Sequence, residues 1–273
     1  MDPSATQKVR DYREVIEAVD RAAREIPSLR VVELGAVEAA EKRYPFHHLT
    51  LKGANKTGNP KSRPVYIGGG IHGDEPGGVW AVLEFLRRYK TLPDRYHHFD
   101  YTILPCTNPF GYEHNTRRNA AGIDLNRQFR SPSPPIEVHW VKKAVGDRSF
   151  HLAMEFHEDV DTPGFYLYEL TQKGERSWGR EMIARIGEKY PVNRSEEIEG
   201  MPAEEGLIHR QPGEIDFRKI MEQRADWPQA FYHYANGSRR CYTTETPVHL
   251  TREERAEIHL TALDSALQKL WES

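Results

Sequence analysis

The sequence predicts an α/β protein with a mixed, mostly parallel, twisted sheet that helices cover on both faces. Three observations support this prediction. Apolar, strand-like runs alternate with stretches of helical periodicity along the chain. The run at 65–67 is short and apolar, as in strands that are buried on both faces. The 273 residues contain no internal repeat and no clear linker, so we expect a single domain over residues 1–273.

Apolar residues at steps of three and four predict the helices. In the first helix this spacing runs from Val9 to Ile26, and Pro27 ends it. The last helix begins with Thr251 as N-cap and Glu254 three residues later, a pair that forms a capping box. The expected helices are 9–26, 79–89, 136–145, 175–190 and 251–271.

Short apolar runs bounded by Gly, Pro or polar residues predict the strands, and Gly35 and Gly53 are expected to end the first two. The expected strands are 29–34, 46–51, 65–67, 101–104, 150–156, 165–170 and 240–244. The composition of 55–63 indicates a solvated loop or hairpin, and 191–228 is expected to form loops with a short helix. Residues 105–135 have little periodicity, and an irregular stretch of this length is usually functional.

Composition excludes several classes of protein. Apolar residues make up 38% and charged residues 29%, which is typical of a soluble globular chain. The net charge of -3 gives no basic excess for nucleic acid, and no apolar run of about 18 residues is present to span a membrane. The first residues lack the order of a signal peptide, so we expect a cytoplasmic protein. Cys106 and Cys241 follow or lie in strand-like runs, which favours buried free thiols.

A glycine turn after the 65–67 strand presents two possible metal ligands. Gly68, Gly69 and Gly70 are followed by His72 and Glu75, three positions apart, and then by a helix. Ligand sites in open α/β sheets lie at the carboxyl ends of strands, which is where this turn would be. His-x-x-Glu also arises by chance, so a plain surface turn remains the alternative for this stretch alone.

The 105–135 stretch is rich in arginine. Arg117, Arg118 and Arg127 occur among small and polar residues, with Asp124 and Asn126 as possible orienting partners. Because the planar guanidinium group pairs a carboxylate with two hydrogen bonds, this pattern suits recognition of a carboxylate. The alternative is a surface loop with solvated charges.

Two further polar residues end apolar strands. His157 follows 150–156, and together with His72 and Glu75 it would give two His and one carboxylate, a catalytic zinc arrangement. The nearby Glu155, Glu158 and Asp159 are candidates for orienting a ligating imidazole, although solvated charge is the simpler interpretation of Glu158. Glu245 follows 240–244, where a carboxylate that faces activated water can act as general base and then general acid. Taken alone, His157 is more often an ordinary core or surface histidine, and Glu245 is more often only a polar residue at the end of a strand.

Together these motifs resemble the zinc carboxypeptidases of peptidase family M14, in their small bacterial branch without a pro-segment. The resemblance covers roughly residues 60 to 250 and implies the zinc carboxypeptidase-like fold. The motifs occur in the family's order: His72-Gly73-Asp74-Glu75, Asn108-Pro109-Phe110-Gly111-Tyr112, Arg117, Asp124-Leu125-Asn126-Arg127, His157 and Thr244-Glu245-Thr246. The chain is also similar to the aspartoacylase and succinylglutamate desuccinylase group, which shares this core.

The resemblance implies roles for individual residues. His72, Glu75 and His157 match the ligands of one Zn²⁺ per chain, and Glu245 matches the glutamate that activates water. Asn126 and Arg127 match the pair that holds the substrate's terminal carboxylate. Arg117 matches the arginine that stabilises the oxyanion, with Arg118 as the alternative. The family's mobile tyrosine has two candidates here, Tyr232 and Tyr234.

Three functions therefore compete. The first is a zinc metallocarboxypeptidase, a hydrolase acting on a peptide or peptide-like amide with a free carboxylate. The second is an amidohydrolase acting on an N-acyl amino acid, as in the aspartoacylase-like group. The third is a binding protein with an inactive site. About one helix follows Glu245, where the aspartoacylase-like relatives usually add a β-rich segment, and this favours the peptidase. All expected ligands and Glu245 are present, which disfavours the inactive protein.

Overall fold

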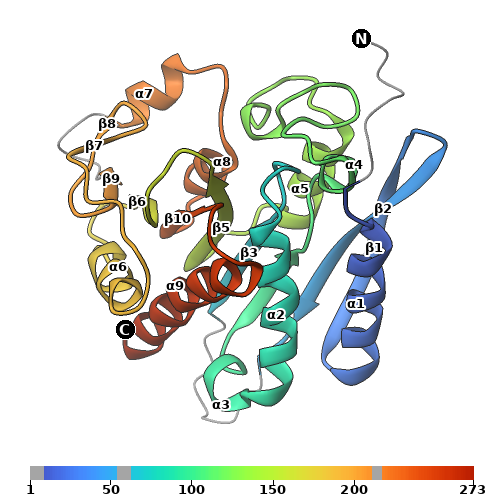
Figure 1. The fold of residues 1–273 in the computed structure, drawn as a ribbon, viewed down its shortest axis with the longest axis horizontal. Helices are drawn as coiled ribbons and strands as arrows, with labels where there is room; N and C mark the ends of the chain where they lie inside the picture. The colour runs from blue at the N-terminus through green and yellow to red at the C-terminus, as the bar shows by residue number, and fades with distance from the viewer. Residues whose placement is uncertain (1–8, 54–62, 211–216) are drawn as a thin grey trace.

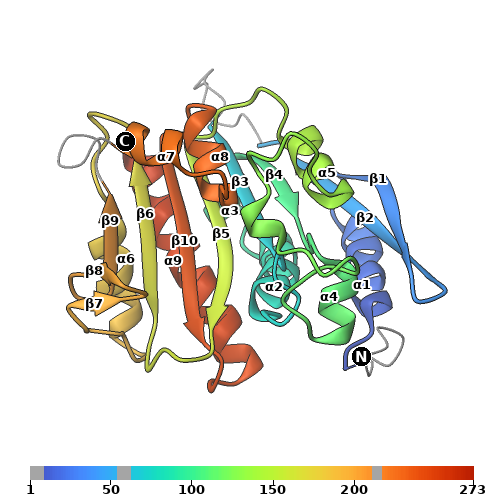
Figure 2. The same cartoon turned by 90° about the horizontal axis from the view of Figure 1, so that it is seen from above.

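The computed structural model describes residues 9–53, 63–210 and 217–273. An eight-stranded twisted sheet in the order β1-β2-β4-β3-β5-β10-β6-β9 forms its centre (Figures 1 and 2). The four middle strands β4, β3, β5 and β10 run parallel to one another. Antiparallel partners flank them, β2 beside β4 and β6 beside β10, and the predicted mixed, mostly parallel sheet is confirmed.

The strands are β1 (Leu29–Ala39), β2 (Lys42–Leu51), β3 (Pro64–Gly69), β4 (Asp100–Leu104), β5 (Leu152–Asp159), β6 (Tyr166–Thr171), β7 (Glu197–Ile198), β8 (Met201–Pro202), β9 (Leu207–Arg210) and β10 (Arg240–Pro247). The helices are α1 (Tyr12–Glu25), α2 (Gly77–Thr91), α3 (Pro93–Tyr96), α4 (Pro109–His114), α5 (Ile136–Val145), α6 (Gly179–Gly187), α7 (Phe217–Gln223), α8 (Gln229–Ala235) and α9 (Arg252–Glu272).

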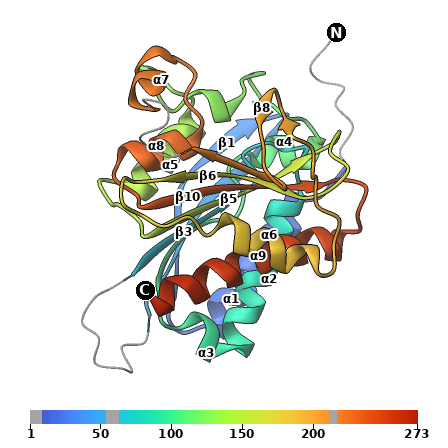
Figure 3. The same cartoon turned by 90° about the vertical axis from the view of Figure 1, so that its left-hand side faces the viewer.

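Helices cover both faces of the sheet, as predicted (Figure 3). Apolar residues of α2, α6 and α9 form one buried layer with one face of the strands, including Phe85, Ile183 and Leu263. On the other face α4, α5 and α8 pack around a second buried layer, which includes Tyr66 and Trp140. Because both faces of the central strands are covered, β3 and β5 are buried along nearly their whole length.

Several boundaries differ from the predictions. The first helix begins at Tyr12, since the side chain of Asp11 caps its N-terminus. Gly35 does not end a strand but lies inside β1, next to an irregularity in its pairing with β2. The irregular 105–135 stretch contains α4 and a 3₁₀ turn at Leu125–Arg127, and strand β9 was missed. The expected loop at 55–63 lies outside the described residues except for its last position.

Two other expectations, a capping box and buried free cysteines, are confirmed. Thr251 caps α9 and forms the predicted capping box with Glu254. Cys106 and Cys241 are buried free thiols. Within the described residues, no helix is long and apolar enough to cross a membrane.

Candidate active site

The turn after β3 is shaped by glycine. Gly70 has φ of 64°, in the left-handed region that glycine adopts without strain. Gly73 lies against the first turn of α4, where a Cβ would come 1.9 Å from the carbonyl carbon of Gly111 and 2.3 Å from its Cα. This contact fixes the turn that carries His72 and Glu75.

Gly73→Ala is expected to destabilise the fold severely, by about 3 kcal/mol or more, because two backbone segments must separate to admit the methyl group. Gly187→Ala is the matched control. Its Cβ would meet nothing nearer than 3.5 Å, so the melting temperature should change little. Thermal unfolding of both variants measures the difference, and equal stability would show that the backbone contact at Gly73 is not a constraint.

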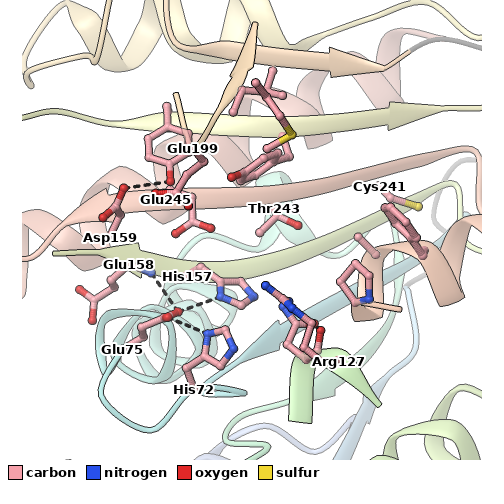
Figure 4. Close-up of a pocket in the computed structure, with 18 of the residues that line it drawn as sticks. His72, Glu75, Arg127, His157, Glu158, Asp159, Glu199, Cys241, Thr243 and Glu245 are labelled. Carbon is pink, nitrogen blue, oxygen red and sulfur yellow. Dashed lines mark hydrogen bonds and ion pairs between the residues drawn. The ribbon is translucent and has the colours of Figure 1, made fainter. Parts of the chain in front are cut away.

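Three side chains converge beyond this turn (Figure 4). His72 Nδ1 lies 2.6 Å from one carboxylate oxygen of Glu75, and His157 Nδ1 lies 2.7 Å from the other. All three residues are buried. The backbone N–H of Glu158 also donates to Glu75, at 3.2 Å. Two strand ends, β3 and β5, therefore bring together three residues that lie up to 85 positions apart.

His72 has a second partner, Asp124. Its Nε2 lies 3.2 Å from Asp124 Oδ1, so both ring nitrogens face a carboxylate. Arg117 joins the same group, with Nη1 2.9 Å from Glu75 and Nε 3.4 Å from Asp124. The sequence suggested Asp124 as a partner for arginine, and the structure adds that it orients His72.

Charges in this cluster shift several pKa values. Burial opposes ionisation of Glu75, but His72 and His157 outweigh it and hold the Glu75 pKa well below its usual range. Burial also lowers the pKa of His72, yet Glu75 and Asp124 raise it overall. Burial lowers the pKa of His157 and keeps its imidazole neutral, the form that binds metal.

These residues fit a metal ion. The ligand atoms of His72, Glu75 and His157 lie within 4.8 Å of one another, and among the described residues no other such cluster is found. Two imidazoles and one carboxylate are a donor set used for catalytic zinc. The Asp124 carboxylate behind His72 is the kind of partner that fixes the orientation of a ligating imidazole.

Glu245 stands beside this cluster. It lies in β10, where it is the neighbour of His157 on β5 and of Tyr166 on β6. Burial raises the pKa of Glu245 well above its usual range, the carboxylates of Glu75 and Asp159 add to the shift, and Arg117 opposes it. Within the described part of the chain, no group donates a hydrogen bond to the Glu245 carboxylate. It is therefore free to meet a ligand in the cavity.

A cavity of about 400 Å³ connects the predicted residues. Its walls include, among others, His72, Glu75, Arg117, Asn126, Arg127, His157 and Glu245. Arg118 is not among them, because its Nη1 donates to the carbonyl of Gly122 at 3.1 Å. The structure therefore places Arg117, and not Arg118, at the cavity.

The predicted tyrosines do not line this cavity. Tyr232 packs against Phe129 with ring centroids 5.7 Å apart, and Tyr234 is buried in the core. Tyr166 and Tyr168 line the cavity instead. They alternate along β6 on the face that carries Leu170, and this period of two was the signal in the sequence that could have found them.

The carboxylates near His157 differ from the expectation. Glu155 faces His233, with 3.3 Å between its Oε1 and Nε2, and Asp159 accepts from the Tyr166 hydroxyl at 3.0 Å. Glu158 is not a solvated charge, because it is buried and accepts from Arg255 and from the Gly77 N–H. The expectation that these carboxylates orient a ligating imidazole is wrong. Alternation along β5 turns Glu158 to the opposite face from His157.

Comparison with known proteins agrees with this geometry. The family model for zinc carboxypeptidase matches residues 15–158. Carboxypeptidase 2 of Trichophyton rubrum is 27% identical over 144 residues, which are 50% of this chain and 26% of that protein. The chain thus matches only about a quarter of the length of its curated relatives.

Solved structures share the fold. A candidate metallopeptidase of Shewanella baltica OS155 has a TM-score of 0.74 at 20% identity, covering 98% of this chain and 99% of that chain. A metallo-carboxypeptidase of Burkholderia cenocepacia has a TM-score of 0.66 at 22% identity, covering 96% and 69%. The family match spans more than half of the residues and contains His72, Glu75 and His157. The chain belongs to the zinc carboxypeptidase family.

Proposed function

We propose that this protein is a zinc-dependent metallocarboxypeptidase, which hydrolyses the C-terminal peptide bond, or a similar amide bond, of a substrate with a free carboxylate. The observation that supports it is one cavity whose walls include the His72, Glu75 and His157 trio, the guanidinium groups of Arg117 and Arg127, and the Glu245 carboxylate, to which none of the described residues donates a hydrogen bond. We assign the whole chain, residues 1–273, to one catalytic domain.

His72, Glu75 and His157 would hold one Zn²⁺ per chain. When bound, this ion acts as a Lewis acid that polarises a carbonyl oxygen and lowers the pKa of water to about 7. Asp124 keeps the His72 ring in place through Nε2, so the Nδ1 atom remains directed at the ion site.

The residues of the protein then have separate roles in the reaction. Glu245 accepts a proton from the attacking water and returns it to the leaving nitrogen, since its carboxylate lines the cavity next to His157. Arg117 lines the cavity beside the trio, where its positive charge stabilises the negative charge that develops on the carbonyl oxygen. Asn126 and Arg127 hold the terminal carboxylate and so position the bond for attack.

We expect stoichiometric zinc in the wild-type protein and loss of zinc in His72→Ala and His157→Ala. Each variant leaves only two of the three protein ligands that a catalytic zinc site uses. Metal content is measured by mass spectrometry of elements after purification in zinc-containing buffer. His139→Ala serves as a control with a histidine outside the cluster. Full zinc occupancy in either ligand variant would overturn the ligand assignment.

The activity is tested with purified, zinc-loaded protein on two substrate sets, peptides with a free C-terminus and N-acyl amino acids. Release of a single C-terminal residue from the peptides is the expected result. Turnover of the N-acyl amino acids alone would instead establish an amidohydrolase of the aspartoacylase type.

A further inference from the structure

The residues assigned to the substrate's carboxylate are tied to a segment about a hundred positions further along the chain. The backbone N–H of Gln229, the first residue of α8, donates to Asn126 Oδ1 at 2.8 Å. No side chain at Pro228 caps this helix, so Asn126 satisfies one of its unpaired N–H groups. This hydrogen bond therefore caps the start of α8 and at the same time holds the amide oxygen of Asn126.

This bond determines which way the Asn126 amide points. An amide side chain has one oxygen acceptor and one NH₂ donor group, and here the oxygen is engaged by a backbone donor. The NH₂ group must then lie on the other side. Among the residues that the structure describes, none accepts a hydrogen bond from it, and Asn126 is part of the cavity wall. It is available to a carboxylate in the cavity.

The side chain of Gln229 anchors the start of α8 to the central sheet. Gln229 is 1% exposed, and its Nε2 donates to the hydroxyl of Tyr66 at 2.6 Å and faces His233 Nε2 at 3.3 Å. Tyr66 is fully buried in β3, the strand that leads to His72. The amide of Asn126 is therefore linked through Gln229 to the same strand that delivers a metal ligand.

The surroundings keep this link uncharged and close-packed. Burial lowers the His233 pKa to about 3, so its ring is neutral. Gly68 leaves the space in which the network fits, because a Cβ there would come 2.6 Å from both the Tyr66 hydroxyl and Glu155 Oε2. No other residue type fits at this point of β3 without displacing the phenol.

A second set of hydrogen bonds holds the segment around Arg127 against the segment that precedes Gln229. The N–H of Phe129 donates to the carbonyl of Trp227 at 3.2 Å. Arg130 donates to the carbonyls of Met221, Glu222 and Arg224 at 2.6–2.9 Å. The stretch on either side of Arg127 thus runs along the segment that ends in Gln229.

We propose that Gln229, held by Tyr66, is a positioning residue that keeps the amide of Asn126 directed at the substrate's terminal carboxylate. This inference rests on the proposed carboxypeptidase function, in which that carboxylate is bound. Gln229 and Tyr66 touch no substrate themselves, because both are buried behind the cavity wall.

The experiment compares one peptide with its C-terminal amide in wild type, Tyr66→Phe and Gln229→Met. Each variant removes a hydrogen-bonding group and keeps the approximate shape of the side chain. We expect KM for the acid to rise about threefold to thirtyfold, part of the loss that removal of a charged hydrogen bond gives. The kcat value for the acid, and both constants for the amide, should stay within about twofold of wild type, so the preference for the acid falls.

Tyr96→Phe is the matched control. It removes a buried hydroxyl that donates to Asp264 Oδ1 at 2.8 Å, away from the cavity. Any general effect of losing a buried tyrosine hydrogen bond should appear equally here, as a lower melting temperature with an unchanged preference for the acid. Melting temperatures and zinc content of all variants show that the site remains assembled.

A double-mutant cycle separates positioning from other causes. If Tyr66 acts through Asn126, Tyr66→Phe should have almost no further effect in an Asn126→Ala background. Additive effects, or an unchanged acid preference in both Tyr66→Phe and Gln229→Met, would overturn the inference. A wild-type protein that cleaves acid and amide equally would count against the proposed carboxylate anchor itself, which is a different result.

Discussion

Glu245→Gln is expected to lower kcat by about 10²–10⁴-fold and to leave one zinc per chain. The amide keeps the shape of the side chain but cannot accept a proton from water. The backbone should not move, because Thr244 and Thr246 on either side contact His259 of α9 at 2.8 and 3.3 Å. Steady-state kinetics and elemental analysis of the same preparation measure the two outcomes together.

Glu199→Gln provides the comparison for this variant. Glu199 also lines the cavity but is exposed and lies in the turn between β7 and β8, so neutralising it should change kcat less than about threefold. Loss of activity specific to Glu245→Gln then reflects proton transfer and not a general change of charge. Turnover of Glu245→Gln within about tenfold of wild type would rule out the general-base role.

Arg127→Ala should raise KM for a peptide acid by about tenfold to 150-fold, the loss that corresponds to about 1.5–3 kcal/mol for a charged hydrogen bond. The side chain of Arg127 is 41% exposed, and its Nε lies 3.9 Å from the Asp226 carboxylate, so the guanidinium group can pair with a ligand. The peptide amide lacks the charge that Arg127 would bind. The variant should therefore lose most of the preference for the acid and retain its zinc.

Arg118→Ala is the control for Arg127→Ala, since Arg118 is bonded to Gly122 outside the cavity wall. Its KM should stay within about twofold of wild type. An unchanged KM in Arg127→Ala would place the carboxylate anchor elsewhere. Because the sequence alone left Arg118 as an alternative to Arg117, an unchanged kcat and KM in Arg118→Ala also tests whether Arg118 lies outside the site, as its bond to Gly122 indicates.

Much of the fold follows from local patterns in the sequence. The apolar spacing in 136–145 predicted α5 to the residue, and the capping box at Thr251 predicted the start of α9. Such features depend on neighbours within one helical turn, which are visible in the chain. The turn that carries His72 and Glu75 could also be predicted from neighbouring residues, since a strand, a glycine turn and a helix follow one another there.

Boundaries were less predictable, because partners across the sheet decide them. β5 continues through His157 and β10 through Glu245, since each strand gains hydrogen bonds from the other. Both residues were expected just after their strands. The predicted ends of these two strands were only slightly too early in the sequence. However, only the parallel pairing of β5 with β10 shows that His157 and Glu245 are neighbours.

Regular spacing and the order of the motifs were enough to predict the fold class and to single out the three candidate ligands and Glu245. The three-dimensional arrangement was needed to show which arginine faces the cavity, which tyrosines line it, and that Glu158 pairs with Arg255. The link from Asn126 to Gln229 spans 103 positions and leaves no local pattern. The physical reason is that the direction of a side chain depends on what packs against it, and in this fold the packing partners come from distant parts of the chain.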